Sequence, residues 1–214
     1  ARRFGAYAHA GVLEDNMVTY IVRERGGAAD LFTVEHMQLE AYCSAIGKVL
    51  LAALPDAELD AYLDQGPFIA LTPNTITDPD RLRATLLGVR GDGAAYDRHE
   101  VRSDLYCMAV PVHAANGAVR GAISLSFLGD TPTPGTERSA LRSLRSLAGR
   151  AAGHANATDP VDRKSARSSI DCAGDASRLR MIFGPQARYA SPRKSARARG
   201  AATFGREGWR KERE

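Results

Sequence analysis

The sequence predicts an α+β domain with a central, mostly antiparallel sheet. Two pairs of short β-prone runs, separated along the chain by helical segments, point to this class. The first pair spans 6–13 and 17–23, around the turn-like triplet 14–16. The second pair spans 105–113 and 119–127, around Asn116-Gly117. Asn-Gly between two such runs is the strongest short hairpin signal in a sequence.

Helices are predicted between the two hairpins and after the second. Ile46, Val49, Leu50 and Ala53 share one face of a helix over 44–54, which Pro55 stops. A second short helix, 57–63, follows, with Asp56 placed to cap it.

Further along the chain, Asp78-Pro79 resembles a helix cap followed by proline at the first helical position. This third helix stops near Gly91 and Gly93. The last helix runs from Gly135 to roughly residue 155, with an apolar stripe of Leu141, Leu144, Leu147 and Ala151. Residues 31–34 are expected to form a short strand, whereas 35–42 remains ambiguous.

One strand face carries unexpected polar groups. Alternate residues of 119–127 point to opposite faces of the sheet, so Ser124 and Ser126 lie together within an otherwise apolar hairpin. Cys107 from the partner strand and Asp97 from the preceding segment, 96–100, can extend this face. The pattern suggests a small polar ligand pocket, although on the strand alone a solvent-exposed face with two ordinary serines is favoured, because most polar strand residues are exposed.

Charge divides the chain into two unequal parts. Residues 1–155 hold 15 basic and 18 acidic residues, whereas residues 156–214 hold 14 and 7. The body is therefore not a nucleic-acid-binding surface on charge grounds. We expect the tail, 156–214, to be disordered. It is either a basic tail that binds nucleic acid nonspecifically or an inert extension. The absence of an amphipathic stripe favours the second reading.

Composition limits the kinds of site and the cellular compartment that we expect for this chain. The three cysteines are widely spaced and form no CxxC or Cys/His cluster, so neither a metal site nor a cofactor is expected. His99 and His113 have no obvious ligand partner. No apolar run is long enough to span a bilayer, and no membrane partner is expected. The simplest expectation is a reduced, cytoplasmic protein.

Several short motifs occur in order along the chain. They are Gly47-Lys48 with Leu51-Ala52, Thr75-Ile76-Thr77, Gly93, Asp97 with Glu100, Cys107 with Ala109 and Pro111, Asn116-Gly117, and Ala122-Ile123-Ser124. This ordered series resembles the C-terminal effector-binding domain of IclR-type bacterial transcriptional regulators, over roughly residues 5–155. The resemblance implies a GAF/PAS-like fold, in which helices flank a central antiparallel sheet and a pocket lies over one face.

The resemblance also implies a site and partners. The effector contacts of the family fall on Ala45, Ile46, Gly47, Asp97, Cys107, Ser124 and Ser126. The implied ligand is a small carboxylate, which the N–H groups opening a helix and two serine hydroxyls can bind. Residues 1–155 would be an effector domain shortened at its N-terminus. DNA would be bound only through a missing winged helix-turn-helix domain, and the chain would form a dimer or tetramer.

Other assignments remain open. Tyr42 and Tyr106 either line the pocket or pack in the core, with the core favoured, and Glu100 is expected to pair with Arg98 or Arg102. A thiol enzyme on the same scaffold could use Cys107 or Cys43. Against this, Cys107 lies in an apolar strand, where a thiol usually behaves as a small hydrophobe. The chain is therefore expected not to be an enzyme, with a purely structural dimerisation module as the other alternative.

Overall fold

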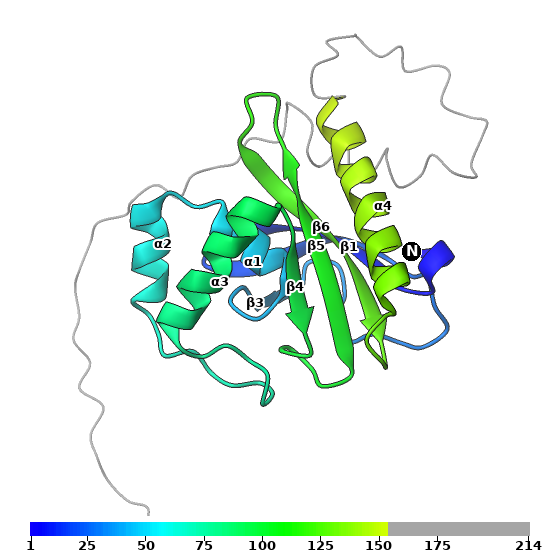
Figure 1. The fold of residues 1–214 in the computed structure, drawn as a ribbon, viewed down its shortest axis with the longest axis horizontal. Coiled ribbons are helices and arrows are strands. Elements are labelled where there is room, and N and C mark those ends of the chain that lie inside the picture. Colours follow the sequence, from blue (N-terminus) through cyan, green and yellow to red (C-terminus); the bar gives the residue numbers. More distant parts are fainter. Residues whose placement is uncertain (154–214) are drawn as a thin grey trace, which may run out of the picture.

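The computed structural model describes residues 1–153, which form a six-stranded antiparallel sheet with helices on both faces (Figure 1). The order across the sheet is β3-β2-β1-β6-β5-β4. The strands are β1 (Tyr7–Glu14), β2 (Met17–Glu24), β3 (Gln38–Glu40), β4 (Ala95–Arg98), β5 (Leu105–His113) and β6 (Val119–Leu128). The predicted α+β class with a central antiparallel sheet is therefore confirmed.

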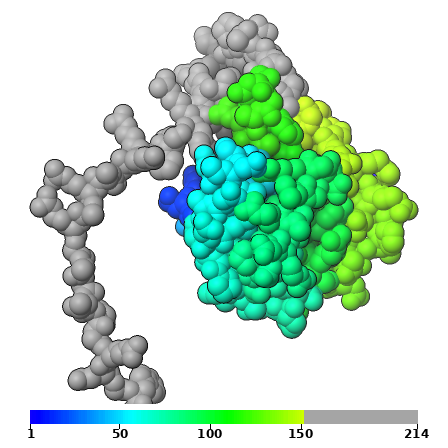
Figure 2. All heavy atoms as spheres, turned by 60° about the vertical axis from the view of Figure 1, so that its left-hand side comes forward, coloured from blue at the N-terminus to red at the C-terminus, as the bar shows by residue number. Residues whose placement is uncertain are grey.

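The helices divide between the two faces of this sheet. α4 (Pro134–Gly153) packs on one face, along β5 and β6, and α1 (Ala45–Ala52) packs on the other. α3 (Pro79–Asp92) packs against α1, and α2 (Asp56–Leu63) against α3. Figure 2 shows α2 and α3 forming one flank of the molecule, with the β5–β6 turn projecting beyond them.

Both predicted hairpins form, within one or two residues of the expected bounds. Between β1 and β2, Asp15 and Asn16 both adopt positive φ, at 51° and 66°. Between β5 and β6, Gly117 has φ 83°, and the Asn116 side chain accepts a hydrogen bond from the Ala118 N–H. Short hairpin loops need such left-handed residues, which is why Asp-Asn and Asn-Gly mark the two-residue turn between β1 and β2 and the longer loop between β5 and β6.

Two helices begin at a residue whose side chain caps them, as the sequence predicted for Asp78. The Ser44 side chain accepts a hydrogen bond from the Gly47 N–H at 3.1 Å, and the Asp78 side chain accepts one from the Arg81 N–H at 2.8 Å. Each cap satisfies an N–H group that has no partner within its own helix. Gly93 ends α3 with φ 61°, a left-handed conformation that glycine adopts without strain.

Two local predictions are wrong. Residues 31–34 form no strand, because this segment folds over the sheet instead of pairing with it; the short edge strand is β3, within the stretch left ambiguous. Asp56 does not cap α2. It is the first residue of that helix, and its carboxylate accepts from Arg90 at 2.7 Å, an ion pair with α3.

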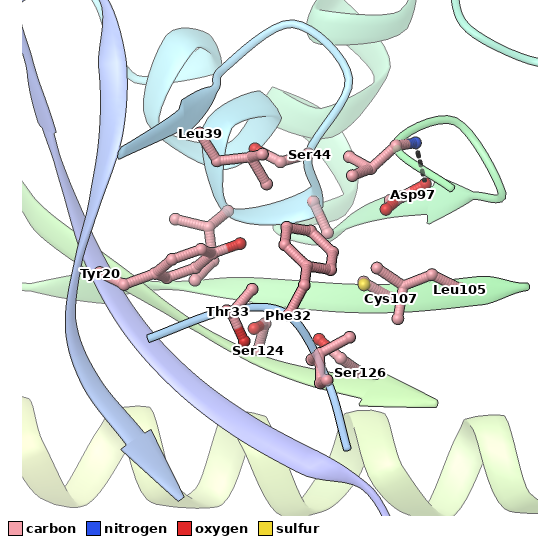
Figure 3. Close-up of a pocket in the computed structure, with 14 residues that line it drawn as sticks. Tyr20, Phe32, Thr33, Leu39, Ser44, Asp97, Leu105, Cys107, Ser124 and Ser126 are labelled. Atoms are coloured by element: carbon pink, nitrogen blue, oxygen red, sulfur yellow. Dashed lines mark hydrogen bonds between the residues drawn. The ribbon is translucent and has the colours of Figure 1, made fainter. Parts of the chain in front are cut away.

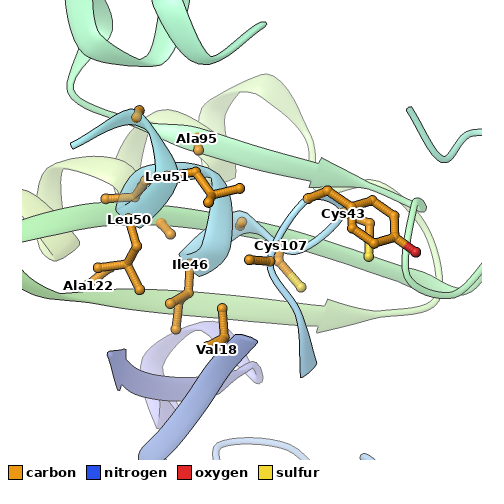
Figure 4. Close-up of a cluster of buried hydrophobic side chains, with 14 of the residues drawn as sticks. Val18, Cys43, Ile46, Leu50, Leu51, Ala95, Cys107 and Ala122 are labelled. Atoms are coloured by element: carbon orange, nitrogen blue, oxygen red, sulfur yellow. The ribbon is translucent and has the colours of Figure 1, made fainter. Parts of the chain in front are cut away.

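The sheet separates two apolar clusters. Between the sheet and α1, a cluster that includes Val18, Ile46, Leu51 and Ala122 is almost completely buried (Figure 4). On the other face, Met108, Ile123 and Leu125 pack with the predicted stripe of α4. Burying each large aliphatic side chain contributes about 1.5–3 kcal/mol, so α1 and α4 are held mainly by their apolar faces.

The predicted tail, 156–214, and the last residues of the predicted final helix lie outside the described residues. Within residues 1–153, no helix is both long and apolar enough to cross a membrane.

Candidate functional site

The polar row predicted on the sheet exists and is buried. Asp97 on β4 lies opposite Cys107 on β5, which lies opposite Ser126 on β6. Ser124 lies two residues earlier on the same strand face, opposite His9 on β1. The four predicted side chains are between 1% and 7% exposed and face α1. The alternative of a solvent-exposed face is therefore wrong.

The N-terminus of α1 faces this row across a small cavity. Ser44, Ala45 and Ile46 line the cavity opposite the sheet. The Gly47 N–H is engaged by the Ser44 side chain, whereas the N–H groups of Ala45 and Ile46 have no recorded hydrogen-bond partner in residues 1–153. Because a helix N-terminus carries partial positive charge, these two N–H groups suit an anion.

Gly47 is the one predicted contact that does not line the cavity. A Cβ atom there would lie 2.2 Å from the carbonyl oxygen of Ala41, closer than any real contact. Its glycine therefore allows α1 to approach the preceding loop.

A segment between β2 and β3, residues 25–37, closes the cavity; we call it the cover segment. Leu31, Phe32 and Thr33 of this segment line the cavity together with Tyr20 and Leu39. Figure 3 shows the Phe32 ring among the lining side chains and the Tyr20 hydroxyl directed towards the interior. The remaining volume is about 10 Å³, which holds roughly one water molecule. A ligand larger than water must therefore displace part of this lining.

Asp97 presents one satisfied and one unsatisfied oxygen. Its Oδ1 accepts from the backbone N–H groups of Glu100, at 2.7 Å, and Val101, at 3.3 Å. Its Oδ2 is buried and has no hydrogen-bond partner in the described part of the chain. Burial raises the pKa of Asp97 to about 6, although the Glu100 N–H and Lys48 act against this rise. The free oxygen is suited to accept from a ligand hydroxyl or amine.

A buried ion pair fixes the turn that follows Asp97. Lys48 on α1 is 1% exposed and donates to the Glu100 carboxylate and to the carbonyl oxygen of Tyr96, the latter at 3.0 Å. The expected ion pair of Glu100 with Arg98 or Arg102 is wrong, because Arg102 pairs with Asp104 and Arg98 donates to Glu100 through its backbone N–H, at 3.4 Å. Lys48 thus links α1 to the residues on both sides of Asp97.

The two thiols in the described chain are poor nucleophiles. Cys107 is buried, and this burial, followed by the nearby Asp97 charge, raises the pKa of its thiol well above the usual value. Burial also raises the pKa of the Cys43 thiol. A reactive cysteine needs the thiolate form, which an electropositive environment stabilises. The thiol-enzyme alternative therefore finds no support in this geometry.

Several residues of the site were not identified from the sequence, among them His9, Tyr20, Phe32 and Thr33. His9 Nε2 lies 2.9 Å from Thr33 Oγ1, and His9 Nδ1 lies 3.4 Å from Ser126 Oγ. Burial, and then Arg23, lowers the pKa of His9 to about 3, so the ring is neutral. The period-two alternation of β1 could have placed His9 beside Ser124, but nothing in the sequence places the cover segment.

The two ambiguous tyrosines belong to the core. The Tyr42 hydroxyl donates to the Ile69 carbonyl at 2.8 Å, and its ring stacks on Phe68. Tyr106 points to the opposite face of the sheet and donates to Glu137 on α4. Within residues 1–153, no group of three His, Cys, Asp or Glu side chains is placed to hold a metal ion.

A second, more open hollow of about 530 Å³ lies between the end of α1 and the β5–β6 turn. Its lining is mainly apolar and includes Leu13, Leu50, Leu54 and Val119. It lacks the converging polar groups that orient a small ligand, so the enclosed cavity is the stronger candidate site.

Comparison with known proteins identifies the fold and the relatives. Residues 1–150 match the family described as "Bacterial transcriptional regulator IclR C-terminal". Over 129 residues the chain is 36% identical to the HTH-type transcriptional regulator XynR of Escherichia coli K12. That match covers 60% of this chain and 51% of XynR, so the chain spans about half the length of this relative.

Solved structures agree with this match. The C-terminal domain of the E. coli transcriptional regulator KdgR superposes with a TM-score of 0.62 at 28% identity, covering 69% of this chain and 86% of that domain. An IclR homologue from Microbacterium hydrocarbonoxydans, complexed with 4-hydroxybenzoate, shares the fold with a TM-score of 0.62 at 24% identity, covering 69% and 59% of the two chains. The chain therefore belongs to the IclR family of bacterial transcriptional regulators, and its described domain is the C-terminal effector-binding domain of that family.

Proposed function

We propose that the enclosed cavity binds a small organic acid and that binding changes how a DNA-binding domain of the whole regulator engages its operator. The observation that carries this proposal is the convergence of three kinds of group on one cavity. These are the unpaired N–H groups opening α1, the buried hydroxyls of Ser124 and Ser126, and the free Oδ2 of Asp97.

These groups suit the two ends of a small acid. A carboxylate needs donors, which the Ala45 and Ile46 N–H groups and the serine hydroxyls supply. A hydroxyl at the far end of the ligand can donate to Asp97 Oδ2, which is short of a donor. The 4-hydroxybenzoate bound by the Microbacterium homologue has both groups, and it is the first compound to test.

The regulatory step belongs to the same proposal. Ligand binding changes DNA affinity only if the two conformations of the regulator bind the ligand unequally. Because the cavity is closed, a ligand can enter only when the cover segment opens, and the cover segment then closes over the ligand. The conformations with the cover segment open and closed therefore bind the ligand unequally. We place this regulator, a homodimer or homotetramer, in the bacterial cytoplasm, where operators lie.

A thermal-shift screen of the full chain against aliphatic and aromatic carboxylic acids tests the proposal. A ligand that binds only the folded state raises the melting temperature, by a free energy of about 2.7 kcal/mol at one hundred times its Kd. We expect one acid to raise it, and Ser124→Ala or Asp97→Asn to reduce the shift.

Two controls make the screen specific. Ser143→Ala removes a partly buried hydroxyl on α4, across the sheet from the cavity, and should leave the shift unchanged. Ala115→Trp places a large ring at the open hollow. If that change, and not Ser124→Ala, abolished the shift, the acid would bind the hollow and the proposed site would be wrong. No shift with any acid would contradict the proposed function itself.

A further inference from the structure

A chain of buried polar groups joins the floor of the cavity to its cover. Ser126 belongs to the floor, on β6, and Thr33 belongs to the cover segment. His9 on β1 contacts both, with Nδ1 3.4 Å from Ser126 Oγ and Nε2 2.9 Å from Thr33 Oγ1. All three residues are at most 4% exposed, so water does not replace these contacts.

His9 is held firmly in this bridging position. Its ring stacks near Tyr7 and Tyr20, with centroid separations of 6.2 and 4.8 Å. Tyr7 also binds the cover segment directly, because its hydroxyl donates to the Ala29 carbonyl at 2.8 Å. Arg23 donates to the Leu31 carbonyl at 3.2 Å. The cover segment is therefore anchored to β1 and β2, and the His9 anchor also contacts Ser126 of the predicted carboxylate site.

The direction of hydrogen bonding from Thr33 through His9 to Ser126 depends on the tautomer of His9. A neutral imidazole has one N–H donor and one acceptor nitrogen. With the proton on Nε2, His9 donates to Thr33 and accepts from Ser126. With the proton on Nδ1, His9 donates to Ser126 and accepts from the Thr33 hydroxyl. Only the second arrangement leaves the Ser126 O–H free to point into the cavity.

We propose that His9 is a positioning residue that couples a bound carboxylate to the cover segment. The proposal rests on the proposed function, because it requires an acid at Ser126. A carboxylate accepts from the Ser126 hydroxyl, so Ser126 Oγ accepts from His9 Nδ1–H, and His9 Nε2 accepts from the Thr33 hydroxyl. Every donor then points from the cover segment towards the ligand, and each hydrogen bond polarises the next. The acid thereby strengthens the contact that holds Thr33 over it.

Calorimetric titration of 4-hydroxybenzoate, or of the acid that gives the largest thermal shift, into four variants of the full chain tests this coupling. Thr33→Val keeps the shape of the side chain and removes only its hydroxyl. We expect Kd to rise about 3- to 10-fold, as for loss of one hydrogen bond. Thr33→Ser, which restores a hydroxyl, should rescue the affinity. His9→Phe keeps an aromatic ring between the two tyrosines but removes the hydrogen-bonding nitrogens between Thr33 and Ser126. It should raise Kd at least as much as Thr33→Val.

The double variant His9→Phe/Thr33→Val separates relay from direct contact. If His9 couples Thr33 to the acid, the Thr33 change has no further effect in the His9→Phe background. If Thr33→Val raised Kd by the same factor in the His9→Phe variant as in the unaltered protein, Thr33 would touch the ligand itself, and the relay would be overturned. Circular-dichroism melting confirms that each variant is folded at the titration temperature.

The primary amide of the same acid gives a readout that does not depend on His9→Phe folding. An amide offers both a donor and an acceptor to Ser126, so it does not select one direction for the hydrogen bonds that run through His9. Thr33→Val should therefore weaken acid binding more than amide binding. Equal weakening contradicts the relay while leaving the proposed function intact, as does an acid whose binding Ser126→Ala does not affect. Failure of every acid to bind the unaltered chain overturns both.

Discussion

Asp97 shows how a buried carboxylate reduces the stability of the folded domain near neutral pH. Its folded pKa is about 6, against 3.8 for the exposed group, because burial disfavours the charged carboxylate. Between these values the folded chain binds more protons than the unfolded chain. Stability from Asp97 is therefore fully present below pH 4 and is lost as the pH rises through about 6.

Asp97→Asn should remove this loss. Each pKa unit corresponds to about 1.4 kcal/mol, so the variant should gain up to about 3 kcal/mol over the unaltered chain between pH 4 and pH 6.5. Urea unfolding at a series of pH values measures the difference. If the gain in stability of Asp97→Asn over the unaltered chain were no larger at pH 7 than at pH 4, the assigned burial of this charge would be contradicted.

His9 has the opposite dependence and supplies the control. Its folded pKa of about 3 lies below the usual 6.5, so the unfolded chain binds more protons between these values, and stability falls as the pH falls. The two slopes oppose each other between pH 4 and pH 6. His9→Phe should therefore expose the Asp97 slope, whereas Asp97→Asn should expose the His9 slope.

Lys48 and Glu100 act at the scale of elements, because they join α1 to the turn after β4. Lys48→Met leaves the Glu100 carboxylate buried without its cation, which should destabilise the domain by ~3–5 kcal/mol. Lys48→Met/Glu100→Leu removes both charges and should recover most of that loss in chemical denaturation. Equal instability of the single and double variants would show that something other than the stranded charge is responsible.

The approach of α1 to the preceding loop depends on one glycine. Gly47→Ala places a Cβ against the Ala41 backbone, which cannot move aside as a flexible side chain would. We expect a loss of about 1–3 kcal/mol, together with weaker acid binding, because Ser44 to Ile46 line the cavity. Gly88→Ala in exposed α3 is the matched control, since its Cβ meets nothing within 4 Å. That change should stabilise by about 0.5–1 kcal/mol. Thermal melting of both variants measures these two changes in stability.

The elements that the sequence predicted well are those fixed by local chemistry. Asn116-Gly117 defines one hairpin, Asp78-Pro79 opens α3, and the alternation of β6 separates Ser124 and Ser126 from the α4 face. The cover segment could not be predicted in this way, because its position depends on contacts with distant residues. Residues 31–34 have the composition of a strand, yet Leu31 and Thr33 are held by side chains of β1 and β2.

The same division holds within the candidate site. Ser124, Ser126, Cys107 and Asp97 meet because antiparallel register places them in neighbouring positions, which alternation and hairpin turns can predict. Lys48 and Glu100 are 52 residues apart in the sequence, and they pair because α1 packs over the sheet. No local sequence pattern therefore predicts this pair. That the predicted residues bind an effector stays a prediction, while the convergence of all of them except Gly47 on one cavity is observed.

At the scale of the whole molecule, the two faces of the sheet have different tasks. The face under α4 is filled by apolar side chains and supports the fold. The face under α1 combines an apolar cluster with the polar cavity, and the cover segment closes that cavity almost completely. A ligand must therefore change the cover segment, whereas α4 and the β5–β6 turn can stay as they are.

Hydrogen–deuterium exchange with and without the bound acid tests this account most directly, because exchange reports opening of each segment. We predict that the acid slows exchange in the cover segment, at the start of α1 and in the turn after Asp97. We also predict that residues 114–119, at the open hollow, keep their rates. Protection confined to 114–119, or acid binding that leaves the cover segment unprotected, would contradict an effector enclosed between α1, the sheet and residues 25–37.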